Sequence, residues 1–185
     1  MKTEHRLAEA LKNMMSERSL DDISVLALTK KCKVNRQTFY YYFHDIYDLL
    51  SLVFLDEKIK GIEDCKNYLA ILTKIYDYYS KNNRFVDATL NSAGKDLFQE
   101  FIYNIFYQAS IRFVTNVEDS KKLTPNGRKT IARFYASAYS NSTIYYLANY
   151  KNKSLNGLLN CFAFMEDKQI AKSVQNMVKN IAKTA

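Results

Sequence analysis

The sequence is poor in the residues that interrupt helices. Its 185 residues include 4 glycines and 1 proline, so few positions can end a helix or adopt the positive φ angles of tight hairpins. Tryptophan is absent. With 48% hydrophobic and 25% charged residues, the chain still has enough apolar material for a buried core. These features predict an all-α globular protein without a β-sheet.

Cysteines, long apolar runs and nucleotide-binding motifs are also scarce. Cys32, Cys65 and Cys161 are odd in number and far apart, which indicates reduced thiols and not a disulfide framework or a zinc site. Neither a signal peptide nor an apolar run of about 18 residues is found, so we expect a cytoplasmic protein that does not enter a membrane. The only histidines are His5 and His44, and no P-loop, dinucleotide-binding or nucleophile-elbow motif occurs. We therefore expect a protein that is not an enzyme and has no cofactor or metal.

Apolar residues at helical spacing predict nine or ten helices. The first begins near Thr3, and Ser24, Asn35 and Asp45 are suitable N-caps for the next three. Four helix starts in under fifty residues imply short helices joined by tight turns. We predict a three-helix N-terminal domain over residues 1–46 and a helical ligand-binding and dimerisation domain over 47–185. The later helices are predicted at residues 65–81, 84–92, 95–117, 126–149, 155–164 and 167–183.

The stretch KKCKVNRQTFYYYF, residues 30–43, brings cations and phenols together. The chain has a net charge of +8, and this part has no acid to offset its lysines and its arginine. Acids flank it on both sides, at Asp21, Asp22, Asp45 and Asp48. A local positive surface bounded by negative ones predicts where the phosphates of a polyanion lie. Two helices joined by a short turn are also typical of a helix-turn-helix, whose second helix enters the major groove of DNA.

The second helix of this pair has side chains of the types that read bases. Arginine can bond guanine bidentately, glutamine can do the same to adenine, and a threonine methyl can touch the methyl of thymine. Lysines and tyrosine hydroxyls suit phosphate oxygens. We expect Phe39, Tyr42 and Phe43 to hold the helix in place; the alternative is a solvated helix pair whose tyrosines belong to the core. The predicted DNA-binding residues are Lys30, Lys31, Lys33, Asn35, Arg36, Gln37, Thr38, Tyr40, Tyr41 and His44.

The segment ISVLALTKKCKVNRQTFYYYFHDIYDLLSLVF resembles the helix-turn-helix of the TetR family of bacterial transcriptional regulators. Lys33 stands where the family usually has glycine, and Leu26 and Ile46 replace common polar and basic contact residues. The resemblance implies a homodimer that binds a palindromic operator, acts as a repressor and is released by a small, largely apolar effector. The matching residues are Val34, Asn35, Arg36, Thr38, Phe39, Tyr40, Tyr42, Phe43, Asp48, Leu49 and Leu50.

The C-terminal half also resembles a subgroup of the family that includes regulators of dihydroxyacetone kinase operons. Some members of that subgroup act as activators with a protein co-regulator. A rival interpretation is therefore a helical protein-interaction module, or a co-activator that works through a partner protein instead of a small ligand. Salt dependence separates the two interpretations, because neutralisation of phosphates makes DNA affinity fall steeply with salt.

Two sets of residues in this half are candidates for the functions that the resemblance implies. Helical stripes with 4-3-4 spacing suit a dimer interface, the alternative being that they pack on the core of their own chain. Aromatic rings suit a pocket for an apolar effector, although such rings also build cores. The interface candidates are Ile131, Tyr135, Ala138, Ser142, Tyr145, Ile170, Val174, Met177 and Ile181. The pocket candidates are Tyr76, Tyr79, Phe98, Phe101, Phe106, Phe134 and Tyr139.

Overall fold

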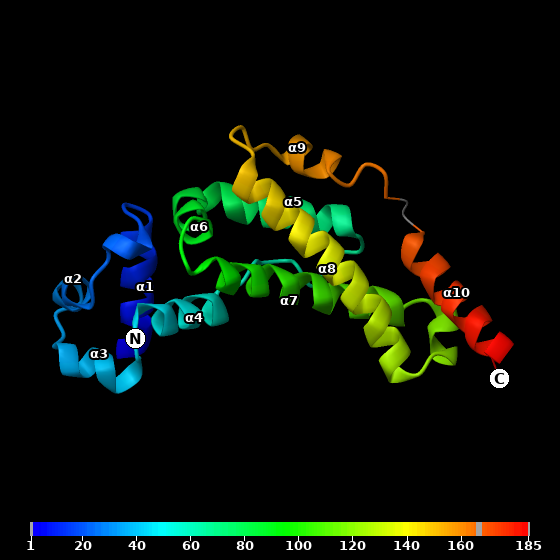
Figure 1. Ribbon diagram of the computed structural model, residues 1–185, viewed down its shortest axis with the longest axis horizontal. Coiled ribbons are helices and arrows are strands. Elements are labelled where there is room, and N and C mark those ends of the chain that lie inside the picture. Colours follow the sequence, from blue (N-terminus) through cyan, green and yellow to red (C-terminus); the bar gives the residue numbers. More distant parts are fainter. Residues whose placement is uncertain (1, 166–167, 185) are drawn as a thin grey trace. The chain divides into compact units, whose positions relative to one another are not determined.

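The computed structural model describes residues 2–165 and 168–184, which form ten α-helices and two 3-10 helices with no strand among them (Figure 1). The predicted fold class, all-α with nine or ten helices, is confirmed. None of the described helices is long and apolar enough to cross a membrane. The elements are α1 Thr3–Met15, η1 Leu20–Asp22, α2 Val25–Lys31, α3 Arg36–Tyr42, α4 Ile46–Asp56, α5 Tyr68–Lys81, α6 Asn83–Leu90, α7 Lys95–Thr115, η2 Glu118–Lys122, α8 Pro125–Asn149, α9 Leu155–Asn160 and α10 Gln169–Thr184.

The helix boundaries follow local capping chemistry. α8 begins with Pro125 in its first turn, where the missing N–H costs nothing, and the Thr124 hydroxyl accepts a hydrogen bond from the backbone N–H of Gly127 at 3.1 Å. α5 begins at Tyr68, three residues later than predicted, while α9 ends four residues early, at Asn160. The predicted start of the last helix, Asp167, lies outside the described residues.

The chain divides into two compact units. Unit 1 contains the residues up to Lys58 together with Asp77–Phe101, and unit 2 contains Ile59–Tyr76 together with the residues from Ile102 onward. Helices α5 and α7 therefore contribute residues to both units. This division differs from the predicted boundary after residue 46, because α1 packs against α4 and α6 as well as α2.

Unit 1 has an apolar core that extends beyond the N-terminal helices. Phe54 of α4 lies 5.5 Å from Phe85 of α6 and 5.7 Å from Phe98 of α7, measured between ring centroids. A Cβ atom added at Gly94 would lie 2.5 Å from Cδ2 of Leu50, so the start of α7 approaches α4 more closely than a side chain would allow. The N-terminal helices therefore share their core with α6 and the start of α7.

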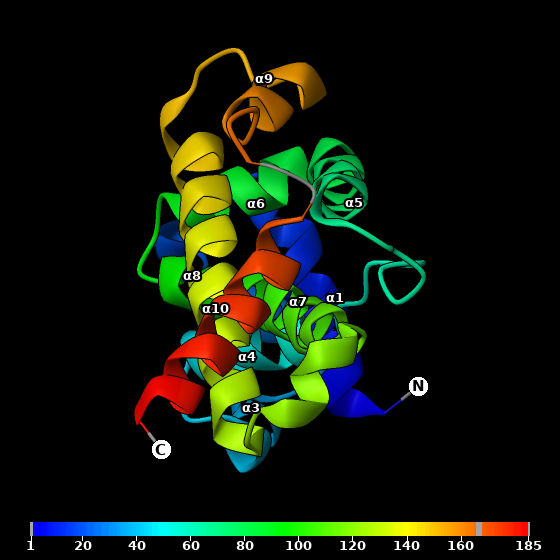
Figure 2. The ribbon, with the colours of Figure 1, turned by 90° about the vertical axis from the view of Figure 1, so that its right-hand side faces the viewer.

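Unit 2 is built around α8, with α10 lying beside it (Figure 2). The Tyr146 hydroxyl accepts a hydrogen bond from the backbone N–H of Ser154 at 2.9 Å and donates one to its carbonyl at 3.1 Å, which holds the turn into α9. The Arg112 guanidinium of α7 donates to the carbonyl of Cys65 at 2.9 Å and so fixes the segment before α5. All three cysteines are free. Cys32 is buried in unit 1, Cys65 is buried in unit 2, and Cys161 is half-buried.

Candidate functional site

The two helices that carry the predicted DNA-binding residues begin at side-chain caps. The Ser24 hydroxyl accepts a hydrogen bond from the backbone N–H of Ala27 at 3.1 Å, at the start of α2. The Asn35 Oδ1 atom accepts one from the backbone N–H of Thr38 at 2.7 Å, at the start of α3, and another from the Thr38 hydroxyl at 2.9 Å. Asn35 and Thr38 are thus tied to each other at the end of the helix that is expected to meet DNA.

The turn between α2 and α3 is a Schellman motif. The backbone N–H of Val34 donates to the carbonyl of Thr29 at 3.0 Å, and that of Lys33 donates to the carbonyl of Lys30 at 3.1 Å. Lys33 has a φ angle of +53°, the one positive value at a non-glycine position among the described residues. This is the position of the motif that glycine normally occupies. Lys33 therefore adopts the left-handed conformation itself, without the glycine that is usual at this position.

Replacing Lys33 with glycine is expected to raise the free energy of unfolding by roughly 0.5–1 kcal/mol. Relief of about 1–2 kcal/mol of left-handed strain exceeds the conformational entropy that glycine loses on folding, about 0.5–1 kcal/mol. The same change should weaken DNA binding at low salt, because a cation beside α3 is lost. Urea unfolding and DNA titration measure the two effects. In Lys33→Asn, which removes the charge but tolerates this backbone conformation, unchanged DNA affinity would contradict the phosphate contact.

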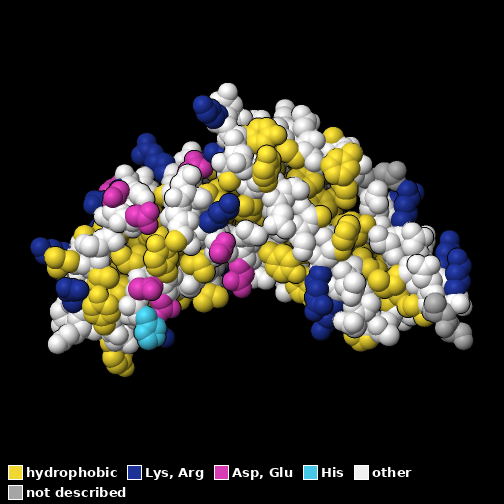
Figure 3. Space-filling model, in the orientation of Figure 1, with side chains coloured by type: hydrophobic (Ala, Val, Ile, Leu, Met, Phe, Trp, Pro, Cys, Tyr) yellow, Lys and Arg dark blue, Asp and Glu magenta, His cyan; other side chains and the backbone are white. Residues whose placement is uncertain are grey.

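The side chains expected to face DNA are accessible. Tyr41 is 81% exposed and Tyr40 is 50% exposed. The Arg36 guanidinium lies over the Tyr40 ring, 5.8 Å from its centroid, and donates to the Tyr40 hydroxyl at 3.4 Å. Hydrophobic side chains, a class that includes tyrosine in Figure 3, are visible at the surface of unit 1 around α3. Thr38 is half-buried, and the other nine predicted residues are exposed: Lys30, Lys31, Lys33, Asn35, Arg36, Gln37, Tyr40, Tyr41 and His44.

The opposite side of α3 anchors the helix. Phe39 is fully buried and Phe43 is 7% exposed, with 5.7 Å between their ring centroids. Both were expected to hold the helix in place. Tyr42 was expected to do the same, and that prediction is wrong, because Tyr42 is 41% exposed and packs its ring edge against Tyr41. Positions 41 and 42 thus form an exposed tyrosine pair.

Two contacts that support the helix pair were missed by the sequence analysis. Arg6 of α1 donates to the carbonyl of Cys32 at 2.7 Å, and so satisfies a backbone acceptor at the end of α2. Asp48 of α4 accepts from the backbone N–H of His44 at 3.1 Å. It lies beside the cap that was predicted, in which Asp45 accepts from the backbone N–H of Asp48 at 2.8 Å. Together the two bonds resemble a capping box, except that Asp48 binds the N–H of the residue before the N-cap; the sequence signal, two acids three residues apart, was present.

The predicted pocket residues do not surround one cavity. Tyr79, Phe98 and Phe101 belong to unit 1, whereas the other four belong to unit 2. Phe98 and Phe106 are fully buried in the two cores. The remaining residues are Tyr76, which donates to the carbonyl of Lys153 at 3.0 Å; Phe134, which is 68% exposed; and Tyr139, which lines a cavity in unit 2.

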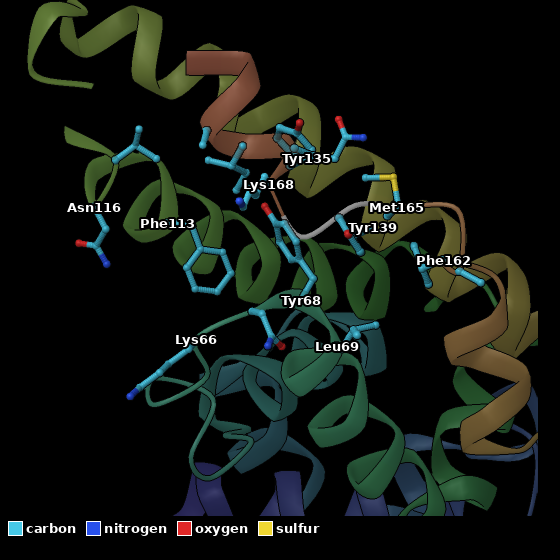
Figure 4. Close-up of a pocket in the computed structure, with 16 residues that line it drawn as sticks. Lys66, Tyr68, Leu69, Phe113, Asn116, Tyr135, Tyr139, Phe162, Met165 and Lys168 are labelled. Carbon is cyan, nitrogen blue, oxygen red and sulfur yellow. The ribbon is translucent and has the colours of Figure 1, made fainter. Parts of the chain in front are cut away.

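That cavity has a volume of about 380 Å³, and aromatic rings form part of its wall together with aliphatic and polar side chains (Figure 4). Tyr68 and Tyr139 stack with 3.9 Å between ring centroids, and Phe162 stacks on Tyr139 at 4.7 Å. Phe113 meets Tyr68 edge to face at 5.2 Å. The rings come from α5, α7, α8 and the segment after α9, so no single helical stripe in the sequence indicates them.

The phenol groups of the cavity already have partners within the chain. The Tyr68 hydroxyl shares a hydrogen bond with Ser110 at 2.7 Å, and the Tyr135 hydroxyl shares one with Ser173 at 2.8 Å. Burial raises the pKa of the Tyr68 phenol above its ordinary value, and the bond with Ser110 offsets this only in part. The Tyr68 phenol is therefore neutral at physiological pH.

The predicted interface residues are divided between the core and the surface of unit 2. Ile131, Tyr135, Ile170 and Val174 are buried within the chain. Ala138, Ser142, Tyr145 and Ile181 are exposed, and Met177 is half-buried. Tyr135 and Ile170 also line the aromatic cavity, and Ile131, Met177 and Ile181 line a groove of about 570 Å³ between α8 and α10.

Charge is distributed unequally between the two units. Unit 1 contains 12 Lys and Arg against 13 Asp and Glu, a net charge of −1, although the segment between Ser24 and His44 has no acid. Unit 2 contains 15 Lys and Arg against 6 Asp and Glu, a net charge of +9. In Figure 3, lysines and arginines but no acids are visible over α10. Within the described residues, no group of three or more His, Cys, Asp or Glu side chains could hold a metal ion.

A short helix pair with a Schellman turn, with exposed lysines on α2 and in the turn and an exposed arginine and tyrosines on α3, is the layout of a helix-turn-helix DNA-binding protein. Residues 66–180 match the TetR C-terminal family described as "Transcriptional regulator C-terminal region". The chain therefore belongs to the TetR family of transcriptional regulators, which are DNA-binding proteins and not enzymes.

Two relatives refine this assignment. The chain is 35% identical over 66 residues, 36% of its length, to the HTH-type dhaKLM operon transcriptional activator DhaS of Lactococcus lactis subsp. lactis (strain IL1403). The match covers 35% of that relative, so it spans about a third of its length. A solved structure named dihydroxyacetone kinase operon activator DhaS has the same fold, with a TM-score of 0.59, 22% identity and 96% of each chain covered. The predicted similarity to regulators of dihydroxyacetone kinase operons is thereby confirmed.

Proposed function

We propose that this regulator binds an operator of two-fold symmetry as a homodimer, through α3 of each subunit, in the cytoplasm where the operator DNA lies. The observation that carries this proposal is the exposed surface of α2 and α3, where four cations and no acid surround Tyr40 and Tyr41. Lys30, Lys31 and Lys33 neutralise phosphates, and the tyrosine hydroxyls set the register of α3 on the DNA backbone. Arg36 and Gln37 then read base edges.

A second copy of the chain is the partner that fits the exposed side of α8. No charged residue occurs between Phe134 and Asn149, although Phe134 and Tyr145 are more than 60% exposed. Ala138 and Ser142 lie exposed between these two rings, and their small side chains permit close approach of another helix. An isologous interface across this side of α8 would fix the separation of two recognition helices, as a palindromic operator requires.

Replacing Ala138 with arginine is expected to raise the dimer dissociation constant at least ~10-fold. Both copies of a two-fold interface carry the change, so two bulky cations would meet where two methyl groups pack. Sedimentation velocity over a range of protein concentrations measures the shift. Asn126→Arg adds the same side chain at the exposed start of α8 and should leave dimerisation unchanged; equal behaviour of the two variants would place the interface elsewhere.

The aromatic cavity of unit 2 supports regulation by a small molecule. Its volume of about 380 Å³ lies within the range of small-molecule sites, ~300–1,000 Å³. We propose that occupation of this cavity changes the affinity of the dimer for its operator, and thereby transcription. The relatives are named activators, which favours activation over the repression expected from the sequence. Transcript levels of the regulated genes in a deletion strain test the sign: a fall indicates an activator.

The test of DNA binding is a fluorescence anisotropy titration with the DNA upstream of the gene and with a scrambled duplex, at two salt concentrations. We expect tight, salt-sensitive binding that prefers the upstream DNA. Lys31→Gln should reduce the salt slope by about 1 for each contacting subunit, because one phosphate contact is lost. Lys95→Gln, an exposed lysine elsewhere in unit 1, should not. Equal, weak binding to both duplexes would support the protein-interaction module instead.

A further inference from the structure

We infer that the cavity of unit 2 binds a planar aromatic anion, such as a one-ring or two-ring aromatic carboxylate. This inference rests on the proposed function of the cavity as an effector site and names the chemical class of the effector. Two observations carry it: the aromatic rings that line the cavity and the signs of the charges at its edge.

The walls favour a flat ring over an aliphatic chain. Tyr68 and Phe113 are half-buried, so part of each ring remains accessible, whereas Tyr139 and Phe162, which also line the cavity, are buried and stack on each other. Aromatic rings gain offset-stacked and edge-to-face contacts with a planar ligand beyond the area that they bury. The volume of about 380 Å³ is near the lower end for small-molecule sites and suits one or two fused rings.

The charged groups at the edge of the cavity favour an acid over an alcohol. The hydroxyls of Tyr68 and Tyr135 each bond a serine, and the phenols and amides that line the cavity can bond an alcohol as readily as an acid. The charged residues among the described lining residues are Lys66 and Lys168, both exposed, and no described lining residue is an acid. Ammonium groups bind carboxylates through charge-assisted hydrogen bonds.

The charges around the cavity also favour an anionic ligand. Unit 2 has a net charge of +9, and this count already includes Glu166 and Asp167, which lie outside the described residues. α8, α9 and α10 contain no acid. A site lined by low-dielectric walls and surrounded by one sign of charge attracts ions of the opposite sign. In Figure 4, Lys66 extends outward from the rim, so Lys168, whose side chain lies closer to the rings, is the better candidate for direct contact.

The test compares three probes by isothermal titration calorimetry on the full chain. The first is 2-naphthoate, the second is its neutral counterpart 2-naphthylmethanol, and the third is the aliphatic anion decanoate. We expect saturable binding of 2-naphthoate at one site per chain and at least about 10-fold weaker binding of 2-naphthylmethanol, the ratio expected for one charge-assisted hydrogen bond. Decanoate should also bind more weakly than 2-naphthoate, because it cannot stack.

Three variants locate the site. Lys168→Met keeps the apolar stem and should weaken 2-naphthoate at least about 5-fold while leaving 2-naphthylmethanol unchanged. Phe113→Leu should weaken both aromatic probes about 3- to 10-fold. Lys179→Met removes an exposed lysine of α10 that does not line the cavity, and it should change neither. Circular dichroism melting of each variant shows whether the chain is folded before it is titrated.

The inference is overturned if 2-naphthoate does not bind, if the neutral probe binds equally well, if decanoate binds more tightly, or if Lys179→Met has the same effect as Lys168→Met. A DNA titration on the same preparation separates this result from the proposed function. If the protein binds the operator but not 2-naphthoate, the aromatic-anion site is rejected and the proposed DNA-binding role stands. Binding of 2-naphthoate without operator binding keeps the aromatic-anion site and rejects the proposed DNA-binding role.

Discussion

Replacing Arg36 with alanine is expected to weaken operator binding by ~30-fold or more. A bidentate arginine–guanine contact contributes about 1–3 kcal/mol to discrimination, and a homodimer loses it twice, once in each half-site. Arg36 is exposed, and its one described hydrogen bond within the chain is the 3.4 Å contact with Tyr40. Its loss should therefore change the free energy of unfolding by no more than about 0.5 kcal/mol.

Fluorescence anisotropy with the operator and with a scrambled duplex measures this effect. Because Arg36 is proposed to read a base, the preference for the operator should fall along with the affinity. Arg84→Ala is the matched control, since Arg84 is an exposed arginine of unit 1 on α6, outside the helix pair. An equal loss of affinity for both duplexes in Arg36→Ala would assign this arginine to a phosphate instead.

Replacing Phe39 with alanine is expected to destabilise the protein by about 3–5 kcal/mol, the range for a buried phenylalanine. Phe39 is fully buried, and its ring lies 5.3 Å from that of Tyr40 and 5.7 Å from that of Phe43. The loss would be a large share of the free energy of unfolding of an ordinary domain, about 5–15 kcal/mol. DNA binding should disappear with it, because α3 would no longer be held in place. Urea unfolding followed by circular dichroism gives the energy.

Tyr41→Ala is the control for this change, because it removes a ring of similar size from the same helix. Tyr41 is 81% exposed, so its loss should cost no more than about 0.5 kcal/mol of stability. DNA affinity should nevertheless fall, since the phenol is proposed to contact the operator backbone. Similar destabilisation by the two variants would mean that the rings of α3 share one buried cluster, as in the alternative interpretation of the sequence.

The helix-turn-helix could be predicted in detail because its signals are local. Ser24, Asn35 and Asp45 cap their helices within three residues, and Phe39 and Phe43 lie four residues apart on one side of α3. Such contacts depend on the sequence spacing alone. Tyr42 was assigned to the wrong side because it follows the same run of aromatic residues, and composition does not distinguish the sides of so short a helix.

The aromatic cavity of unit 2 could not be predicted because it depends on contacts between distant segments. Tyr68, Phe113, Tyr139 and Phe162 come from four parts of the chain and are brought together by the packing of unit 2. A ring in a helical stripe has the same sequence signature whether it lines a cavity or fills a core, as Phe106 does. For the same reason, the spacing of the interface stripes could not distinguish surface residues from core residues. Ile131 is buried in its own chain, while Ala138 of the same helix is exposed.

The unequal charge of the two units changes the meaning of the isoelectric point. A sequence pI near 9.2 is commonly taken as a sign that a protein binds nucleic acid. Here that value comes from the unit without the helix-turn-helix, while the unit that carries α3 has a slight excess of acids. A search that selects nucleic-acid-binding proteins by their high isoelectric point would select this chain, but because of charges outside the helix-turn-helix. The informative quantity is the absence of acids within one short helix pair, which a whole-chain average does not detect.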